Sequence, residues 1–106
     1  MPGSFTGKPL AEGQLPAVVA AIYTVPAGTV AYVRFMSFFN TNAVGQTVSI
    51  DIDTAGTPRQ QWRFVLAINE SAKIDDSIVL TAGDIIRGVT TTAAAVNFLI
   101  TGVEEV

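Results

Sequence analysis

Two carboxylates, Asp51 and Asp53, lie two residues apart in the segment Thr47–Asp53, where apolar and polar side chains alternate. On a β-strand this spacing places both on one face, about 6.5–7 Å apart. Such a pair is found in glycoside hydrolases and, with further oxygens, in calcium sites, but those sites draw oxygens from several strands or from a clustered loop. We therefore predict a solvent-facing polar stripe that pairs with Arg59 or Arg63 across a hairpin, or with a second subunit.

The sequence lacks the residues on which much enzyme chemistry depends. Among its 106 residues there is no His and no Cys. This excludes a Ser-His-Asp triad, a thiolate nucleophile, a zinc–sulfur site and a disulfide. The six Lys and Arg residues are scattered and the net charge is −3, which argues against binding to nucleic acid. We expect no catalytic residue, no metal and no cofactor, and predict that the protein is not an enzyme.

Composition predicts one domain with an unusually neutral surface. The chain is 49% hydrophobic and only 14% charged, against about 25% charged residues in an average soluble domain. A surface with so little charge is expected to be covered by copies of the protein or by a partner. Apolar stretches fall far short of the ~20 residues of a membrane-spanning helix, and the first ten residues do not read as a secretory signal. We expect no association with a membrane.

From residue 17 onward the chain reads as short strands separated by turn residues. β-Branched and aromatic residues dominate these runs, and no amphipathic helix of 10–15 residues separates them. The predicted strands are Ala17–Val25, Thr29–Asn40, Thr47–Asp53, Arg59–Ile68, Ile74–Leu80, Ile85–Thr91 and Val96–Val103. The predicted core contains Val48, Ile50, Ile52, Trp62, Phe64, Leu66, Phe98 and Ile100. This pattern predicts an all-β, antiparallel two-sheet β-sandwich, jelly-roll-like, over residues 17–106.

The strand over residues 29–40 is apolar on both faces. Strict alternation places Val30, Tyr32, Met36 and Phe38 on one face and Ala31, Val33, Phe35 and Phe39 on the other. Only one face can fill the core of a sandwich, so the other needs a second cover. We predict an oligomer interface that includes Phe35 and Phe39; a β-bulge that redirects part of the strand is the alternative.

Residues 1–16 contain three prolines and three glycines and show no periodicity. We predict that they form an extended N-terminal arm outside the domain. Phe5, Leu10 and Leu15 are spaced along it as apolar anchors. Sixteen extended residues can span about 50 Å, which is enough to reach a neighbouring subunit.

Three strings resemble small structural proteins of tailed-phage virions. The string Ile-Tyr-Thr-Val-Pro-Ala-Gly-Thr at 22–29 resembles their opening, Leu80–Asp84 matches a Leu-x-Ala-Gly-Asp turn, and Ile100–Glu104 matches an Ile-Thr-Gly-Val-Glu string near their end. The resemblance covers about residues 22–104, and the central strands match in pattern only. It implies a jelly-roll virion protein, commonly trimeric, and supplies no catalytic motif.

The resemblance and the composition together predict a structural virion protein of a tailed bacteriophage. We expect a capsid decoration or cement protein, assembled in the bacterial host cytoplasm, that forms a homotrimer and contacts the major capsid protein or other virion proteins. The alternative is a head- or tail-fibre module that recognises host surface glycans. It would use the aromatic residues Tyr23, Tyr32 and Trp62, or the loops Asn40–Gln46 and Asn69–Lys73. Aromatics at these positions are more often core residues.

Overall fold

The computed structural model describes the backbone of residues 5–106 and the side chains from residue 9 onward. Nine strands and no helix occur in this part of the chain, so it holds no helix that could cross a membrane. The strands are β1 (Phe5–Gln14), β2 (Ala20–Thr24), β3 (Val30–Asn40), β4 (Gln46–Thr54), β5 (Thr57–Leu66), β6 (Ser71–Ile74), β7 (Ile78–Thr81), β8 (Ile85–Thr90) and β9 (Val96–Glu105).

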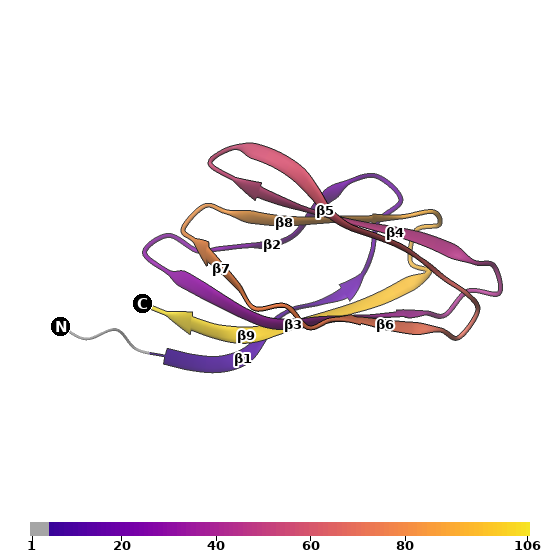
Figure 1. Cartoon of the computed structure of the whole chain (residues 1–106), viewed down its shortest axis with the longest axis horizontal. Helices are drawn as coiled ribbons and strands as arrows, with labels where there is room; N and C mark the ends of the chain where they lie inside the picture. The colour runs from indigo at the N-terminus through magenta and orange to yellow at the C-terminus, as the bar shows by residue number, and fades with distance from the viewer. Residues whose placement is uncertain (1–4) are drawn as a thin grey trace.

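The strands form two antiparallel sheets packed face to face (Figure 1). One sheet has the order β1-β9-β3-β6, with β7 also paired to β3; we call it the β3 sheet. The other has the order β2-β8-β4-β5 and is called the β4 sheet. The prediction of an all-β, antiparallel two-sheet sandwich is confirmed.

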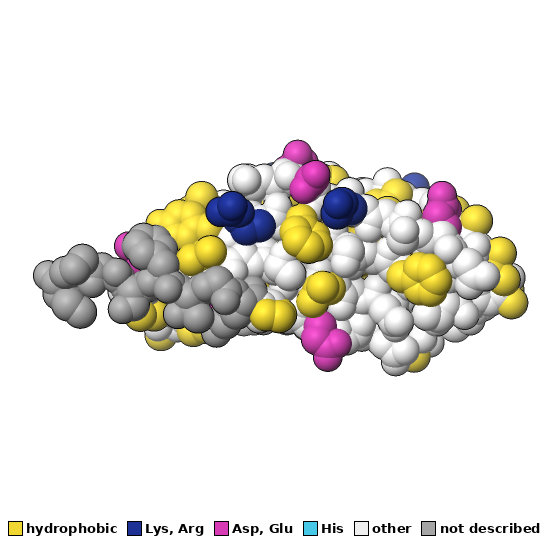
Figure 2. All heavy atoms as spheres, turned by 90° about the horizontal axis from the view of Figure 1, so that it is seen from below, with side chains coloured by type: hydrophobic (Ala, Val, Ile, Leu, Met, Phe, Trp, Pro, Cys, Tyr) yellow, Lys and Arg dark blue, Asp and Glu magenta, His cyan; other side chains and the backbone are white. Residues whose placement is uncertain are grey.

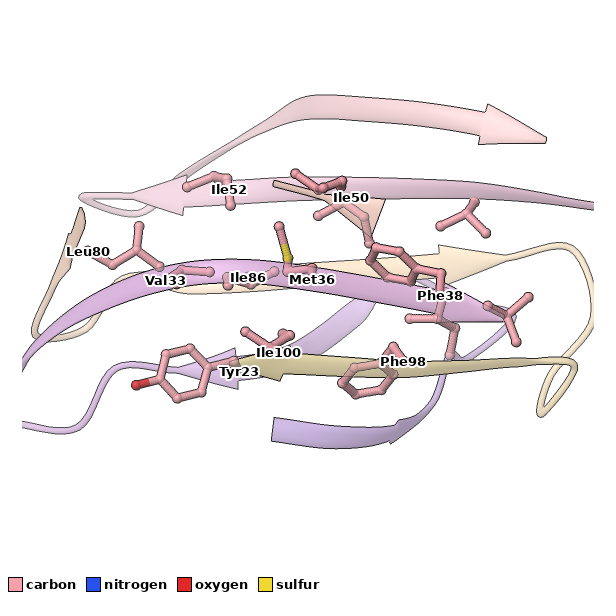
Figure 3. Packing of buried hydrophobic residues seen from close by; sticks show 14 of the residues in the cluster. Tyr23, Val33, Met36, Phe38, Ile50, Ile52, Leu80, Ile86, Phe98 and Ile100 are labelled. Atoms are coloured by element: carbon pink, nitrogen blue, oxygen red, sulfur yellow. The ribbon is translucent and has the colours of Figure 1, made fainter. Parts of the chain in front are cut away.

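The core lies between the sheets, where inward-facing aliphatic and aromatic side chains meet (Figure 3). Six of the eight predicted core residues are buried, namely Val48, Ile50, Ile52, Leu66, Phe98 and Ile100. Trp62 and Phe64 are half-buried and pack against this core, because they belong to β5 at the edge of its sheet. The Phe64 ring lies 5.5 Å from that of Phe38, measured between centroids, in a tilted arrangement.

Strict alternation along β3 is wrong, because a bulge interrupts the strand at Arg34. The pairing with β9 shifts between Val33 and Phe35. Val33 therefore shares the inner face with Met36, and Tyr32 joins Phe35 on the outer face. A bulge adds one residue to a strand and so reverses the alternation beyond it.

The run Ile74–Leu80, predicted as one strand, is divided into β6 and β7 by the exposed residues 75–77. β6 begins at Ser71, inside the predicted loop Asn69–Lys73. Both short strands pair with β3, and the break between them lies opposite the bulge at Arg34. On the other side of β3, β9 continues past the same bulge with a shift in register and no break, so the interruption is confined to this edge of the sheet.

Residues 5–14, predicted as part of an arm outside the domain, form β1 at the edge of the β3 sheet. The strand pairs with β9 from Phe5 opposite Glu105 to Gln14 opposite Asn97, with an irregularity at Leu10. An edge strand tolerates proline, since one side of its backbone needs no partner. Backbone hydrogen bonds to β9 hold this segment in the sheet, and the residue types of the segment alone do not indicate this pairing.

Candidate interaction surface

The outer face of the β3 sheet carries large apolar side chains that no part of residues 9–106 fully covers. We use the name outer apolar face for the residues Tyr32, Phe35, Phe39, Val79 and Leu99. Phe39 is 40% exposed and Val79 is 61% exposed, and the other three are half-buried. Figure 2 views this side and shows hydrophobic side chains spread over a surface that carries few charges.

Phe35 and Phe39, predicted as interface residues, lie on this face. The Lys73 ammonium nitrogen lies 5.8 Å from the centroid of the Phe35 ring, a cation–π contact worth about 0.5–1 kcal/mol at an exposed site. Phe39 is flanked in the pairing by Asn97 and Ser71, whose short polar side chains leave its ring exposed. Their part in an interface stays a prediction.

The predicted arm anchors have different surroundings. Leu15 is fully buried in the core of its own sandwich, and its N–H donates to the Val96 carbonyl at 2.9 Å. It is therefore a core residue and not an anchor on another subunit. Leu10 is half-buried and packs against the same core. The side chain of Phe5 lies outside the described residues.

Asp51 and Asp53 lie on the outer face of the β4 sheet, but Asp53 is not solvent-facing as predicted. Its carboxylate oxygen Oδ2 accepts from Arg87 Nη2 at 3.0 Å, and its side chain is only 7% exposed. The partner comes from β8 rather than from Arg59 or Arg63 of the adjoining hairpin strand. Because this carboxylate is already paired within the chain, an ion pair to another subunit is left to Asp51, which is half-buried.

Little in this region points to catalysis. Within residues 5–106 no three Asp or Glu side chains come close enough to hold a metal ion. The pair Asp51 and Asp53 sits opposite Arg87 and Ile85 on a sheet surface, and one of its members is neutralised by Arg87. The arrangement stabilises the β4 sheet.

The three aromatics proposed as a glycan platform do not come together. Tyr23 is buried on β2, where its hydroxyl donates to Glu104 Oε2 at 2.6 Å. Tyr32 lies on the outer apolar face and donates to Glu105 Oε1 at 2.8 Å, while Trp62 packs against the core from β5. Burial is the main cause that raises the pKa of Tyr23, and the hydrogen bond to Glu104 is the second. The pKa of Tyr32 is raised mainly by its hydrogen bond to Glu105.

The two loops proposed for glycan recognition do come together, at one end of the sandwich. The Asn40 side-chain amide donates to the carbonyls of Leu66 at 3.1 Å and Ala67 at 3.2 Å. The Asn69 N–H donates to the Asn40 carbonyl at 3.1 Å. Buried Gln46 accepts from the Thr92 N–H at 2.8 Å and so attaches the β8–β9 loop. That Asn40 and Gln46 hold neighbouring loops together was not predicted from the sequence. The signal available in the sequence was the position of these two amide residues, one at each end of a turn between apolar strands.

Two of the strings that carry the family resemblance lie side by side at the other end. Val25 donates its N–H to the Asp84 carbonyl at 2.9 Å, and the Gly83 N–H donates to the Val25 carbonyl at 3.0 Å. The Asp84 carboxylate accepts from the Thr81 N–H at 2.9 Å and closes its own turn. Both turns contain a glycine at positive φ, Gly28 at 73° and Gly83 at 89°, which is the conformation that glycine adopts without strain.

Comparison with known proteins shows a shared fold. No protein-family model and no curated protein sequence matches this chain. Among solved structures, a chain of the Bacillus endospore appendages, described as a family of disulfide-linked pili, superposes with a TM-score of 0.59 at 18% identity, covering 96% of this chain and 88% of that one. A chain of infectious bursal disease virus, Gx strain, matches with a TM-score of 0.42 at 12% identity; the match covers 97% of this chain and 32% of the viral one.

Proposed function

We propose that this protein is a structural subunit that self-associates through the outer apolar face. One observation carries the proposal: Phe39 and Val79 remain exposed beside Tyr32, Phe35 and Leu99 on one sheet surface. Exposed aromatic and aliphatic side chains gathered on one surface mark candidate interaction sites. Burying this face against another subunit removes aromatic and aliphatic surface from water, and the one ammonium group over it, that of Lys73 on the Phe35 ring, can remain at the rim of the contact.

The size of the face suits such a contact. Four strand positions about 4.8 Å apart and strands of about ten residues give the whole outer surface of the β3 sheet, of which the outer apolar face is a part, an area of roughly 600 Å². This is of the same order as the ~800 Å² that each partner contributes to a standard protein interface. The contact would be mainly apolar, which is typical of assemblies whose subunits do not function alone.

The fold shared with a pilus protein supports a role in assembly. That protein belongs to pili described as disulfide-linked. This chain contains no Cys, so disulfides are not available to it. In an assembly of this protein, contacts other than disulfides have to join the subunits, and the outer apolar face is a surface that can make them.

Within this role we propose a virion protein of a tailed bacteriophage, most specifically a capsid decoration or cement protein that forms a homotrimer on the major capsid protein. The resemblance of residues 22–29 and 80–84 to such proteins supports this. The order β1-β9-β3-β6 facing β2-β8-β4-β5 supports the jelly-roll class within the sandwich architecture. No catalytic step is proposed.

A fibre or receptor-binding module is the second candidate. It is favoured by the loop cluster, in which Asn40 and Gln46 hold three loops at one end of the sandwich. Copy number on purified particles separates the two: a decoration protein is spread over the shell in many copies, whereas a fibre module is confined to a few positions. A particle reconstruction measures this directly.

Sedimentation equilibrium tests the self-association. We expect the intact protein to sediment as an oligomer at micromolar concentration, with a trimer as the specific expectation. The double variant Phe35→Ser/Phe39→Ser should associate at least about tenfold more weakly, which corresponds to about 1.4 kcal/mol. The matched control is Val65→Ser, which alters a 68% exposed residue on the β4 sheet and should change nothing. An intact protein that sediments as a monomer would contradict the proposal.

A further inference from the structure

The free edge of β2 is exposed and apolar. β2 lies at the end of the β4 sheet and pairs only with β8 among the strands of residues 5–106. Val18 and Val19, which precede it, are 77% and 47% exposed, and Ala20 and Ala21 are also exposed. The backbone N–H and C=O groups on the free side of such a strand are a template for pairing with another strand.

The other edges of the two sheets carry features that discourage such pairing. β5 contains Pro58, Arg59 and Arg63, and its pairing with β4 is irregular between Ile50 and Asp51. β1 contains a proline and an irregularity at Leu10, and the edge made by β6 and β7 is interrupted by residues 75–77. Proline, charge, bulges and short strands are the devices by which proteins protect their edges.

β2 is also short and has a bulge between Ala21 and Tyr23, so the feature that distinguishes it from β1 and β5 is that it carries neither charge nor proline. The whole stretch from Gly13 to Val33 contains no charged residue. An antiparallel pairing of this edge with itself would therefore meet no like-charge repulsion. The same pairing of β5 with itself would bring Arg59 and Arg63 of one copy against those of the other.

We infer that the free edge of β2, together with the exposed residue Val19 that precedes it, is a second self-association site, at which β2 pairs antiparallel with β2 of a second copy about a two-fold axis. The pairing joins two β4 sheets into one continuous eight-stranded sheet. A two-fold contact uses the same patch on both partners, so a short neutral edge is sufficient. This contact uses a different surface from the outer apolar face, and the two together would link subunits into an extended assembly.

Because the chain has no Cys, site-specific disulfide cross-linking gives a clean test. The variants Val19→Cys, Ala20→Cys and Ala21→Cys place single thiols along the edge, and Gln60→Cys on exposed β5 is the matched control. Residues directly opposite in an antiparallel pair have Cβ atoms about 4.5–5.5 Å apart, which is near the separation that a disulfide needs. Under mild oxidation at micromolar concentration, at least one edge variant should form dimers at least about tenfold faster than the control.

Equal rates for all edge variants and the control would overturn the inference. Preferential cross-linking between an edge variant and the Gln60→Cys variant in a mixture would also overturn it, since that result requires a head-to-tail pairing of β2 with β5. Introducing Phe35→Ser/Phe39→Ser into the edge variants should leave their cross-linking intact. Loss of cross-linking in that background would show that the edge contact depends on the outer apolar face and is not an independent site.

Discussion

The two outer faces of this sandwich both alternate with the core but carry different side chains. On the β4 sheet the outward positions of β4 hold Ser49, Asp51 and Asp53, and Asp53 is paired with Arg87. The remaining outward positions include three aliphatic residues, Val65, Ile85 and Val89. On the β3 sheet the equivalent positions hold aromatic rings, and Phe39 stays 40% exposed. The β4 sheet surface therefore mixes polar groups with aliphatic side chains, whereas the β3 sheet surface presents aromatic rings. This difference is the reason we propose the β3 side as the side on which subunits associate.

The bulge in β3 turns Tyr32 toward the outer apolar face, and the backbones of Tyr32 and Gly102 approach each other closely beside it. A Cβ atom at Gly102 would lie 2.2 Å from the Tyr32 carbonyl oxygen, far inside van der Waals contact. We expect Gly102→Ala to lower the free energy of unfolding by about 3 kcal/mol or more. Urea denaturation measures this loss. The control is Gly28→Ala, where positive φ but open space predicts a loss of only about 1 kcal/mol; equal losses would refute the role of the close contact.

On the outer face of the β4 sheet, loss of the ion pair between Asp53 and Arg87 should give the next largest effect on stability. Asp53→Asn leaves the guanidinium without its counter-charge, but Arg87 is 29% exposed and keeps part of its hydration. We expect a loss of about 1–2 kcal/mol in the free energy of unfolding, below that of a fully buried pair. Asp51→Asn, at a half-buried position on the same face, should cost under about 0.5 kcal/mol. If the two substitutions cost the same in urea titrations, the pair does not stabilise the face.

The smallest expected effect is a dependence of stability on alkaline pH. The pKa of Tyr23 is raised in the folded protein above its ordinary value of 10.0, so the folded state holds this proton more firmly than the unfolded state. The resulting stabilisation is fully present below pH 10 and is lost as the pH rises above 10. Between pH 8 and 11 we expect the free energy of unfolding of the intact protein to fall by about 1 kcal/mol more than that of the Tyr23→Phe variant. Parallel pH profiles for the two proteins would contradict this.

Local patterning was sufficient to predict most of the strands and most of the core, but not β1 or the division between β6 and β7. The alternation of Val48, Ile50 and Ile52 is a property of the sequence itself, and it survives folding because the strand is regular. The bulge at Arg34 leaves no such signal, and Gly102, whose backbone approaches closely beside it, comes from a strand far along the chain.

The other differences between the predicted and the observed structure arise from pairing partners that are distant in the sequence. Residues 5–14 have no periodicity of their own, and their structure comes from the backbone edge that β9 presents. In the same way, Asp53 finds Arg87 on β8 because the two strands are neighbours in the sheet, although they are distant in sequence. Hydrogen-bond partners across sheets follow from topology, which residue spacing within a single strand does not determine.

The central claim is that assembly covers the outer face of the β3 sheet and leaves the outer face of the β4 sheet open. Ser37 and Ser49 provide a matched pair, since each is half-buried and points outward from the middle of its sheet. The measurement is the rate at which a soluble maleimide labels Ser37→Cys and Ser49→Cys, at a concentration where the protein is assembled and after dilution. We expect assembly to slow the labelling of Ser37→Cys at least about tenfold, which corresponds to about 1.4 kcal/mol of protection, and to leave the labelling rate of Ser49→Cys unchanged. Equal labelling of the two variants in the assembled protein, or protection of Ser49→Cys alone, would contradict it.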